Sequence, residues 1–326
     1  MNEKKAIIVY GLGKDYELAK HYIENKFNII GYMDKDREKI GGALILPEEL
    51  PNYEYDYICI TSSKYFQEIR DTVVELIGEE NKDKVISIYD AFGDFRNHEI
   101  RDQWVINKLE KIPKGKILLD AGAGQQRYRP FCSHLRYIAQ DFGKYIPNET
   151  AVGLLQDVPW DYTGINITCD IIDMPLDNES VDVILCTEVF EHLINPILAL
   201  KEFSRVLKTN GMLILTAPFC CLTHMAPYFY YNGFSEYWYK EHLNDYGFEI
   251  KEFTGYGNYF AYMCQELLRV ESMAEKYCNI KLESDEMNTI IKSMKIMLRL
   301  SEKDSGSDET LRFGSMLVAE KTVMGK

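Results

Sequence analysis

The chain has 326 residues, which at roughly 150 residues per domain predicts about two domains. Hydrophobic residues make up 46% and charged residues 27%, an ordinary globular composition that argues against a disordered chain. The formal net charge of −14 argues against a sequence-independent grip on nucleic acid phosphates, so we expect no nucleic acid partner.

The apolar runs of the sequence predict no membrane span, because they fall short of the roughly 20 residues needed to cross a bilayer. The opening segment MNEKKAIIVYG passes straight from charge into a strand-like run, so we expect no cleavable signal. The 8 cysteines include no CxxC pair, which favours reduced thiols. Together these features predict a cytoplasmic protein.

Strand and helix signals alternate over residues 1–93 and predict a small α/β domain with a parallel sheet and right-handed crossovers. Its loop Tyr10-Gly11-Leu12-Gly13 follows a buried strand, and Asp34 ends the next strand as a ribose-binding acid would. Expected strands cover 6–10, 27–33, 57–61 and 85–89, with helices at 16–26 and 65–77.

A charged helical stretch at 94–112 predicts a linker, after which the alternation begins again and predicts a second α/β domain over 113–326. Expected strands in chain order cover 116–120, 137–140, 181–186, 212–216, 248–253 and 313–319. Expected helices cover 126–134, 189–207, 261–277 and 284–300.

The sharpest motif is ILLDAGAGQQRYRPF at 117–131. A strand ends at Asp120, and Gly122 and Gly124 let the backbone turn tightly and approach a ligand. A dinucleotide fingerprint would need a third glycine where Arg127 stands, and a carboxylate ahead of the glycines would repel a pyrophosphate. The loop therefore favours a ligand with a cationic end.

Further acids follow at the predicted carboxyl ends of later strands, where open α/β sheets bind ligands. Asp141 could accept hydrogen bonds from both hydroxyls of a ribose, and Asp170 with Ile171 offers an edge suited to an adenine amino group. Thr187 and Glu188 follow the fourth strand, which ends at Cys186. The alternative is that each Asp caps a helix or turn.

Residues 113–323 resemble the class I S-adenosylmethionine-dependent methyltransferases. The matching segments are DAGAG, QDF, CDIIDMPL, VDVILCTEVFEHLINP and LKTNGMLILTAPF. The resemblance implies a seven-stranded, mostly parallel sheet whose last strand is antiparallel, and S-adenosylmethionine as cofactor. It assigns Asp120, Gly122 and Gly124 to the methionine end, Asp141 to the ribose, Asp170 and Ile171 to the adenine, and Cys186, Thr187 and Glu188 to the wall beside the sulfonium.

The aromatic segment after Phe219 predicts a loop over the cofactor that receives the acceptor. His224 is the candidate general base, or else it orients the loop, while His192 orders the helix after the fourth strand. Tyr228 and Tyr230 form either a sugar-stacking surface or the core of a lid. No metal is expected, because no His/Cys cluster has ligand spacing.

Residues 4–92 resemble the small Rossmann-like domains that precede bacterial sugar acyltransferases and sugar-modifying enzymes. The resemblance rests on IIVYGLGK, IIGYMDKD and LPEELPNYEYDYICITS. It implies that the acceptor is a nucleotide-linked sugar or a unit of a surface polysaccharide, and that the protein serves polysaccharide biosynthesis.

The leading hypothesis is thus a methyltransferase acting at O or N of a small, carbohydrate-related acceptor. One alternative is an NAD(P)-dependent sugar oxidoreductase or epimerase centred on Gly11 and Gly13. Another is a non-catalytic protein that binds the cofactor. The sequence leaves the oligomeric state open.

Overall fold

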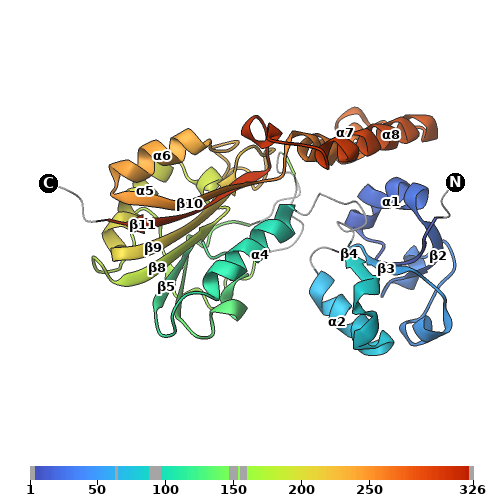
Figure 1. The fold of residues 1–326 in the computed structure, drawn as a ribbon, viewed down its shortest axis with the longest axis horizontal. Coiled ribbons are helices and arrows are strands. Elements are labelled where there is room, and N and C mark those ends of the chain that lie inside the picture. The colour runs from blue at the N-terminus through green and yellow to red at the C-terminus, as the bar shows by residue number, and fades with distance from the viewer. Residues whose placement is uncertain (1–3, 63–64, 88–96, 147–152, 155–159, 323–326) are drawn as a thin grey trace. The chain divides into compact units, whose positions relative to one another are not determined.

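The computed structural model describes residues 4–62, 65–87, 97–146, 153–154 and 160–322. The chain divides into two compact units (Figure 1). Unit 1 consists of Met1–Arg96 and Tyr259–Gly306, and unit 2 of Asn97–Asn258 and Ser307–Lys326. No helix within the described ranges is long and apolar enough to cross a membrane.

Unit 1 contains a parallel four-stranded sheet with the strand order β2-β1-β3-β4. Strand β1, one of the two inner strands, contains three β-branched residues in a row, Ile7, Ile8 and Val9, which are fully buried. Helices follow β1 and β3 in the sequence, which is the strand–helix alternation of the Rossmann-like pattern. The elements are β1 (Ala6–Tyr10), α1 (Lys14–Lys26), β2 (Asn28–Met33), β3 (Tyr57–Ile60), α2 (Phe66–Ile77) and β4 (Val85–Ser87).

Two helices from late in the chain complete unit 1. Helices α7 (Tyr259–Cys278) and α8 (Ser284–Ser301) pack against α1 (Figure 1). Cys264 of α7 and Met294 of α8 are buried in one hydrophobic cluster with Ile7 and Ile23. The units therefore differ from the domain boundaries expected from the sequence, because 259–306 packs with unit 1 and 97–112 with unit 2.

Unit 2 contains a seven-stranded sheet with the strand order β10-β11-β9-β8-β5-β6-β7. Strands β5 to β9 are parallel, whereas β11 is antiparallel to both of its neighbours. The predicted fold class is confirmed. The strands are β5 (Ile117–Ala121), β6 (Arg136–Asp141), β7 (Ile167–Thr168), β8 (Val181–Thr187), β9 (Leu207–Pro218), β10 (Phe248–Tyr256) and β11 (Gly314–Lys321).

Helices cover both faces of this sheet. Side chains of α5 (Pro196–Val206) and α6 (Glu236–Asp245) bury one face together with Leu119. On the other face α4 (Asn97–Leu109) packs over Leu118. Successive residues of β5 thus point to opposite cores, which explains why the strand reads as a continuous apolar run.

Helices α7 and α8 interrupt a β-hairpin of unit 2. Tyr256, the last residue of β10, pairs with Gly314, the first residue of β11, and the Phe313 amide donates to the Tyr256 carbonyl over 3.1 Å. The hairpin is closed without the intervening helices, so residues 259–306 are an insertion at its end.

The helix expected at 126–134 is not formed. The structure has only a 3-10 turn there, Arg129–Cys132. Gln126 has a φ of +56°, outside the right-handed helical region, and Pro130 has no amide hydrogen to donate. The expected helix 189–207 is likewise divided into a 3-10 turn, Phe190–His192, and α5, which begins at Pro196.

Candidate functional site

The candidate site lies where the carboxyl ends of β5, β6 and β8 meet in unit 2. Strand β5 pairs with β6 on one side and β8 on the other. The strand order reverses there, because the chain goes from β5 to β6 and β7 and returns to β8. Such a reversal leaves a crevice beside the carboxyl ends of the strands, where open parallel sheets bind ligands.

The glycines after β5 hold a tight loop at this sheet edge. Gly122 has a φ of +76° and Gly124 a φ of +50°, so both occupy the left-handed region that favours glycine. A Cβ on Gly122 would lie 2.5 Å from a methyl of Val189, and one on Gly124 would lie 2.6 Å from the Trp160 ring. Any side chain at either position would therefore collide with the wall of the loop.

Asp141, the last residue of β6, fixes this loop. Its Oδ2 accepts from the Gly124 amide over 2.9 Å, and its Oδ1 accepts from the Gly143 amide over 2.9 Å. Burial raises the pKa of Asp141, while these amides act in the opposite direction. Because each carboxylate oxygen has two lone pairs, the side chain can cap the loop and still accept a hydrogen bond from a ligand.

Asp120 is a buried carboxyl group at the end of β5, only 2% exposed. The Tyr137 hydroxyl donates to its Oδ2. Burial raises the pKa of Asp120 to about 7; the Tyr137 hydrogen bond opposes this shift, and the nearby Asp141 adds to it. A cationic neighbour would therefore stabilise the charged form of Asp120.

Asp170 and Ile171 follow β7, as the sequence predicts for the third strand. Asp170 is exposed, and its Oδ1 accepts from the Ile172 amide over 3.2 Å, so it caps a turn. The Ile171 side chain is buried at 4% exposure. The structure thus places an exposed carboxylate and a buried apolar side chain together at the expected strand end.

The end of β8 brings Cys186, Thr187 and Glu188 to the same edge. Cys186 is fully buried, and burial raises the pKa of its thiol well above the ordinary value. Glu188 has a φ of +53°. Its Oε1 accepts from the Thr216 hydroxyl over 2.9 Å, and its Oε2 pairs with Arg101 over 3.1 Å.

Arg101 of α4 is a residue of the site that our sequence reasoning missed. It is 8% exposed and also pairs with Asp102 over 3.3 Å. Burial lowers the pKa of Arg101, but the surrounding acids, chiefly Glu188, outweigh burial and raise it. A signal was present: Arg101, Val105 and Leu109 are spaced four apart and all buried, which marks them as one inward helix face.

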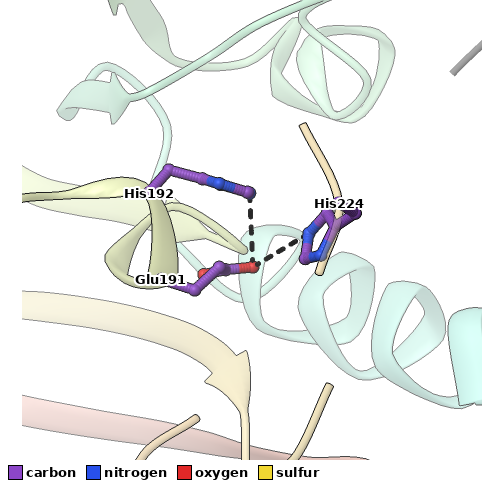
Figure 2. Close-up of side chains that lie close together, drawn as sticks. All are labelled: Glu191, His192 and His224. Carbon is purple, nitrogen blue, oxygen red and sulfur yellow. Dashed lines mark ion pairs between the residues drawn. The ribbon is translucent and has the colours of Figure 1, made fainter. Parts of the chain in front are cut away.

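Glu191, His192 and His224 gather beside the end of β8 (Figure 2). His192 Nε2 lies 3.7 Å and His224 Nε2 lies 3.9 Å from Glu191 Oε1. Burial, followed by the neighbouring His224, lowers the pKa of His192 to about 4, so this imidazole is neutral at physiological pH. From the sequence we predicted separate roles for His192 and His224 and assigned no role to Glu191.

The predicted tyrosines lie on the segment that carries His224. The Tyr228 carbonyl accepts from His192 Nδ1 over 2.6 Å, and its ring meets the Phe142 ring edge-on with centroids 5.1 Å apart. Tyr230 is 44% exposed, and its amide donates to the Glu191 carbonyl over 2.9 Å. Tyr228 is therefore half-buried beside Phe142, whereas the Tyr230 side chain is exposed to solvent.

In the glycine loop of unit 1, as in the loop of unit 2, an aspartate carboxylate accepts a hydrogen bond from a loop amide. Gly11 has a φ of +98°, and the Leu12 amide donates to Asp34 Oδ2 over 2.6 Å. Asp34 Oδ1 accepts from the Asp36 amide over 2.8 Å. The acid predicted to bind a ribose thus caps its own loop.

Two family models match the chain. Residues 119–215 match the family described as "Methyltransferase domain". Residues 3–86 match the family described as "C2185-like, N-terminal". That description names no substrate, so the kinship with sugar-modifying enzymes stays a prediction.

Curated relatives match the chain over part of their length. An "Uncharacterized methyltransferase" of Schizosaccharomyces pombe is 32% identical over 119 residues, which are 36% of this chain and 42% of that protein. A "Probable S-adenosylmethionine-dependent methyltransferase" of Mycobacterium tuberculosis is 28% identical over 127 residues, 38% of this chain and 42% of that protein. The match thus spans about two fifths of each relative.

Among solved structures, the geranyl diphosphate C-methyltransferase of Streptomyces coelicolor, crystallised with S-adenosyl-L-homocysteine, aligns at a TM-score of 0.40 with 13% identity. The alignment covers 70% of this chain and 80% of that chain.

Proposed function

We propose that unit 2 binds S-adenosylmethionine and transfers its methyl group to a small acceptor. The methyltransferase domain at 119–215 supports this function. The observation that carries the proposal is the ordered set at the sheet edge, in which the buried Asp120 precedes two left-handed glycines whose loop is capped by Asp141. A carboxylate ahead of the glycines suits a cationic ligand and disfavours a pyrophosphate.

We divide the residues at this sheet edge among the parts of the cofactor. We assign the methionine end to Asp120, Gly122 and Gly124, because a buried acid gains from a cationic ammonium or sulfonium. We assign the ribose to Asp141, because its oxygens can accept further hydrogen bonds besides those from the two loop amides. Asp170 with Ile171 is assigned to the adenine, and Cys186, Thr187 and Glu188 to the wall beside the sulfonium.

The reaction is an in-line displacement in which the acceptor attacks the methyl carbon and the sulfur leaves as a neutral thioether. Positioning the nucleophile about 3–3.5 Å from the methyl carbon supplies most of the catalysis. A hydroxyl or amine acceptor must also lose a proton. His224 suits this role, because its Nδ1 contacts the Leu222 carbonyl over 2.9 Å and therefore donates, which leaves a lone pair on Nε2.

A carbohydrate-related acceptor, such as a nucleotide-linked sugar, is the substrate class that we propose. The half-exposed ring of Tyr230 on the segment that carries His224 supports it, since aromatic faces stack on sugars. Tyr228, which is half-buried and meets Phe142 edge-on, is the second sugar contact that we propose.

Calorimetry with S-adenosylhomocysteine tests the cofactor assignment. We expect binding by the full chain and a loss of at least about tenfold in affinity for Gly122→Ala, whose Cβ would displace Val189. Gly115→Ala is the matched control, because Gly115 also has a positive φ, +85°, but open space around its Cβ position. Equal losses for both variants, or binding of NAD(H) in place of S-adenosylhomocysteine, would contradict the proposal.

A transfer assay tests the acceptor class. Labelled S-adenosylmethionine is incubated with free sugars, nucleotide sugars, phenols and amines, and the labelled product is identified by mass spectrometry. Transfer to a sugar derivative is expected. Transfer only to a phenol or an amine would remove the carbohydrate assignment, and cofactor binding without transfer to any acceptor would favour a non-catalytic role.

A further inference from the structure

Three potential metal ligands converge in the Glu191–His192–His224 cluster. One ligand atom of each residue lies within 4.8 Å of the other two, and Figure 2 shows both imidazoles directed at the same carboxylate oxygen. The separations of 3.7 and 3.9 Å between the Nε2 atoms and Glu191 Oε1 are too long for hydrogen bonds. The three groups therefore face one another without bonding directly.

The hydrogen bonds of the two imidazoles leave Nε2 of each ring available to coordinate a metal ion. His192 Nδ1 contacts the Tyr228 carbonyl over 2.6 Å, and His224 Nδ1 contacts the Leu222 carbonyl over 2.9 Å. Because a carbonyl only accepts, each Nδ1 carries a proton, and in the neutral form of each ring the lone pair is on Nε2. Histidines that bind metals are oriented in this way, with the other ring nitrogen donating to a carbonyl or carboxylate.

Glu191 supplies an independent indication that this cluster binds a cation. The residue is 1% exposed, and its Oε2 is buried with no hydrogen-bond partner within the part of the chain that the structure describes. An unpaired buried carboxylate is strongly unfavourable unless it takes up a proton or binds a cation. With two imidazole lone pairs facing its other oxygen, a cation would satisfy all three groups at once.

The backbone holds these ligands in place. Glu191 and His192 share the 3-10 turn Phe190–His192, and the Glu191 carbonyl accepts from the amides of Tyr230 and Tyr231 over 2.9 and 3.2 Å. His224 is bridged to Leu154. The segment with His224 is therefore tied to the turn with the other two ligands, which limits the rearrangement needed on binding.

We propose that Glu191, His192 and His224 bind a divalent transition-metal ion. Two imidazole nitrogens and one carboxylate favour Zn²⁺, Fe²⁺, Co²⁺ or Ni²⁺ over Mg²⁺ and Ca²⁺, which prefer oxygen ligands. Three protein ligands leave coordination positions open for water or substrate. The sequence predicted no metal because His192 and His224 lie on different segments, whose meeting no local spacing reveals.

A role for this ion in catalysis rests on the proposed function. An acceptor hydroxyl bound at an open position would lose its proton to solvent more readily, because the ion stabilises the alkoxide. The alkoxide oxygen then forms the bond to the methyl carbon while the carbon–sulfur bond breaks and its electron pair stays on sulfur. His224 would act as a ligand in place of a general base.

Cobalt titration of the untagged, chelator-treated full chain tests the binding site. We expect one equivalent of Co²⁺ to bind, with visible absorption typical of a four- or five-coordinate nitrogen- and oxygen-ligated ion, and Zn²⁺ to displace it. His224→Ala should weaken Co²⁺ binding by at least about 100-fold. His242→Ala, a histidine of α6 that lies 3.7 Å from Asp245 outside the cluster, is the matched control and should bind normally.

Circular dichroism of each variant establishes that it is folded, and Glu191→Gln, which preserves volume, provides a second test if His224→Ala unfolds. Failure of the wild-type chain to bind Co²⁺ stoichiometrically, or equal binding by His224→Ala and wild type, would overturn the metal site. Calorimetry with S-adenosylhomocysteine on the metal-free protein tests the proposed function independently of the metal site. Cofactor binding without Co²⁺ binding refutes only the metal, and Co²⁺ binding without cofactor binding refutes only the proposed function.

Discussion

Asp120 shows how one buried carboxyl group couples stability to ligand binding. Burial raises its pKa from 3.8 to about 7 in the folded protein. Below pH 4 both the folded and unfolded forms carry the proton. As pH rises from about 4 to 7 the unfolded carboxyl ionises first, so stability falls, and it levels off above pH 7.

Replacing Asp120 should therefore separate stability from binding. We expect Asp120→Asn to raise the free energy of unfolding of the ligand-free protein at pH 8, by at most about 4 kcal/mol, since one pKa unit corresponds to about 1.4 kcal/mol. The same variant should lose affinity for S-adenosylmethionine, whose cationic groups need the carboxylate. Urea unfolding from pH 5 to 8 and calorimetry measure the two effects.

Wild-type affinity for S-adenosylmethionine should also rise between pH 6 and 8 as Asp120 ionises, and the Asp120→Asn variant should lack this rise. A variant that is less stable than wild type at pH 8, with unchanged cofactor affinity, would show that Asp120 is a structural cap rather than part of the pocket.

At the scale of elements, α4 is part of the unit that carries the site and does more than link two domains. Its Trp104 indole donates to Glu252 of β10 over 2.9 Å. Its Arg101 reaches Glu188, whose φ of +53° is sterically unfavourable for a residue with a side chain. The Arg101 pair and the Thr216 hydrogen bond thus hold the turn after β8 in the form that presents Cys186 to Glu188.

Removing only one partner of the Arg101–Glu188 pair should destabilise the protein, because the other charge is left uncompensated. Arg101→Met leaves Glu188 without its cationic partner, and we expect it to destabilise the protein by about 3–5 kcal/mol. Adding Glu188→Gln to Arg101→Met should recover a substantial part of that loss, because the uncompensated charge is removed. Denaturant unfolding of the two single variants and the double variant gives the coupling energy; strictly additive effects would argue against a direct interaction.

At the scale of the whole molecule, the chain returns to unit 1 after it has built most of unit 2. The insertion between β10 and β11 supplies α7 and α8, which pack with α1 around buried residues such as Met294, 1% exposed. Unit 1 is therefore assembled from two separate segments of the chain, and its core depends on contacts between residues that are far apart in sequence.

A substitution in α8 should accordingly disturb unit 1 without affecting the cofactor site. We expect Met294→Ala to destabilise unit 1 by about 2–5 kcal/mol through lost burial and a cavity. Ile296→Ala, on the same helix but 47% exposed, should change stability by less than about 0.5 kcal/mol. S-adenosylhomocysteine affinity should be unchanged in both. Equal destabilisation by the two variants would contradict the packing of α8.

The sequence by itself determined the strands, the fold class and the order of Asp120, Gly122, Gly124 and Asp141 along one sheet edge. These features are local, because the carboxyl ends of parallel strands share an edge whatever the rest of the chain does. Only the tertiary structure decided that Arg101 pairs with Glu188, that His224 meets Glu191 and His192, and that 259–306 packs with unit 1. Such contacts join residues far apart in the chain, and a local pattern marks a side chain as buried or polar without identifying its partner.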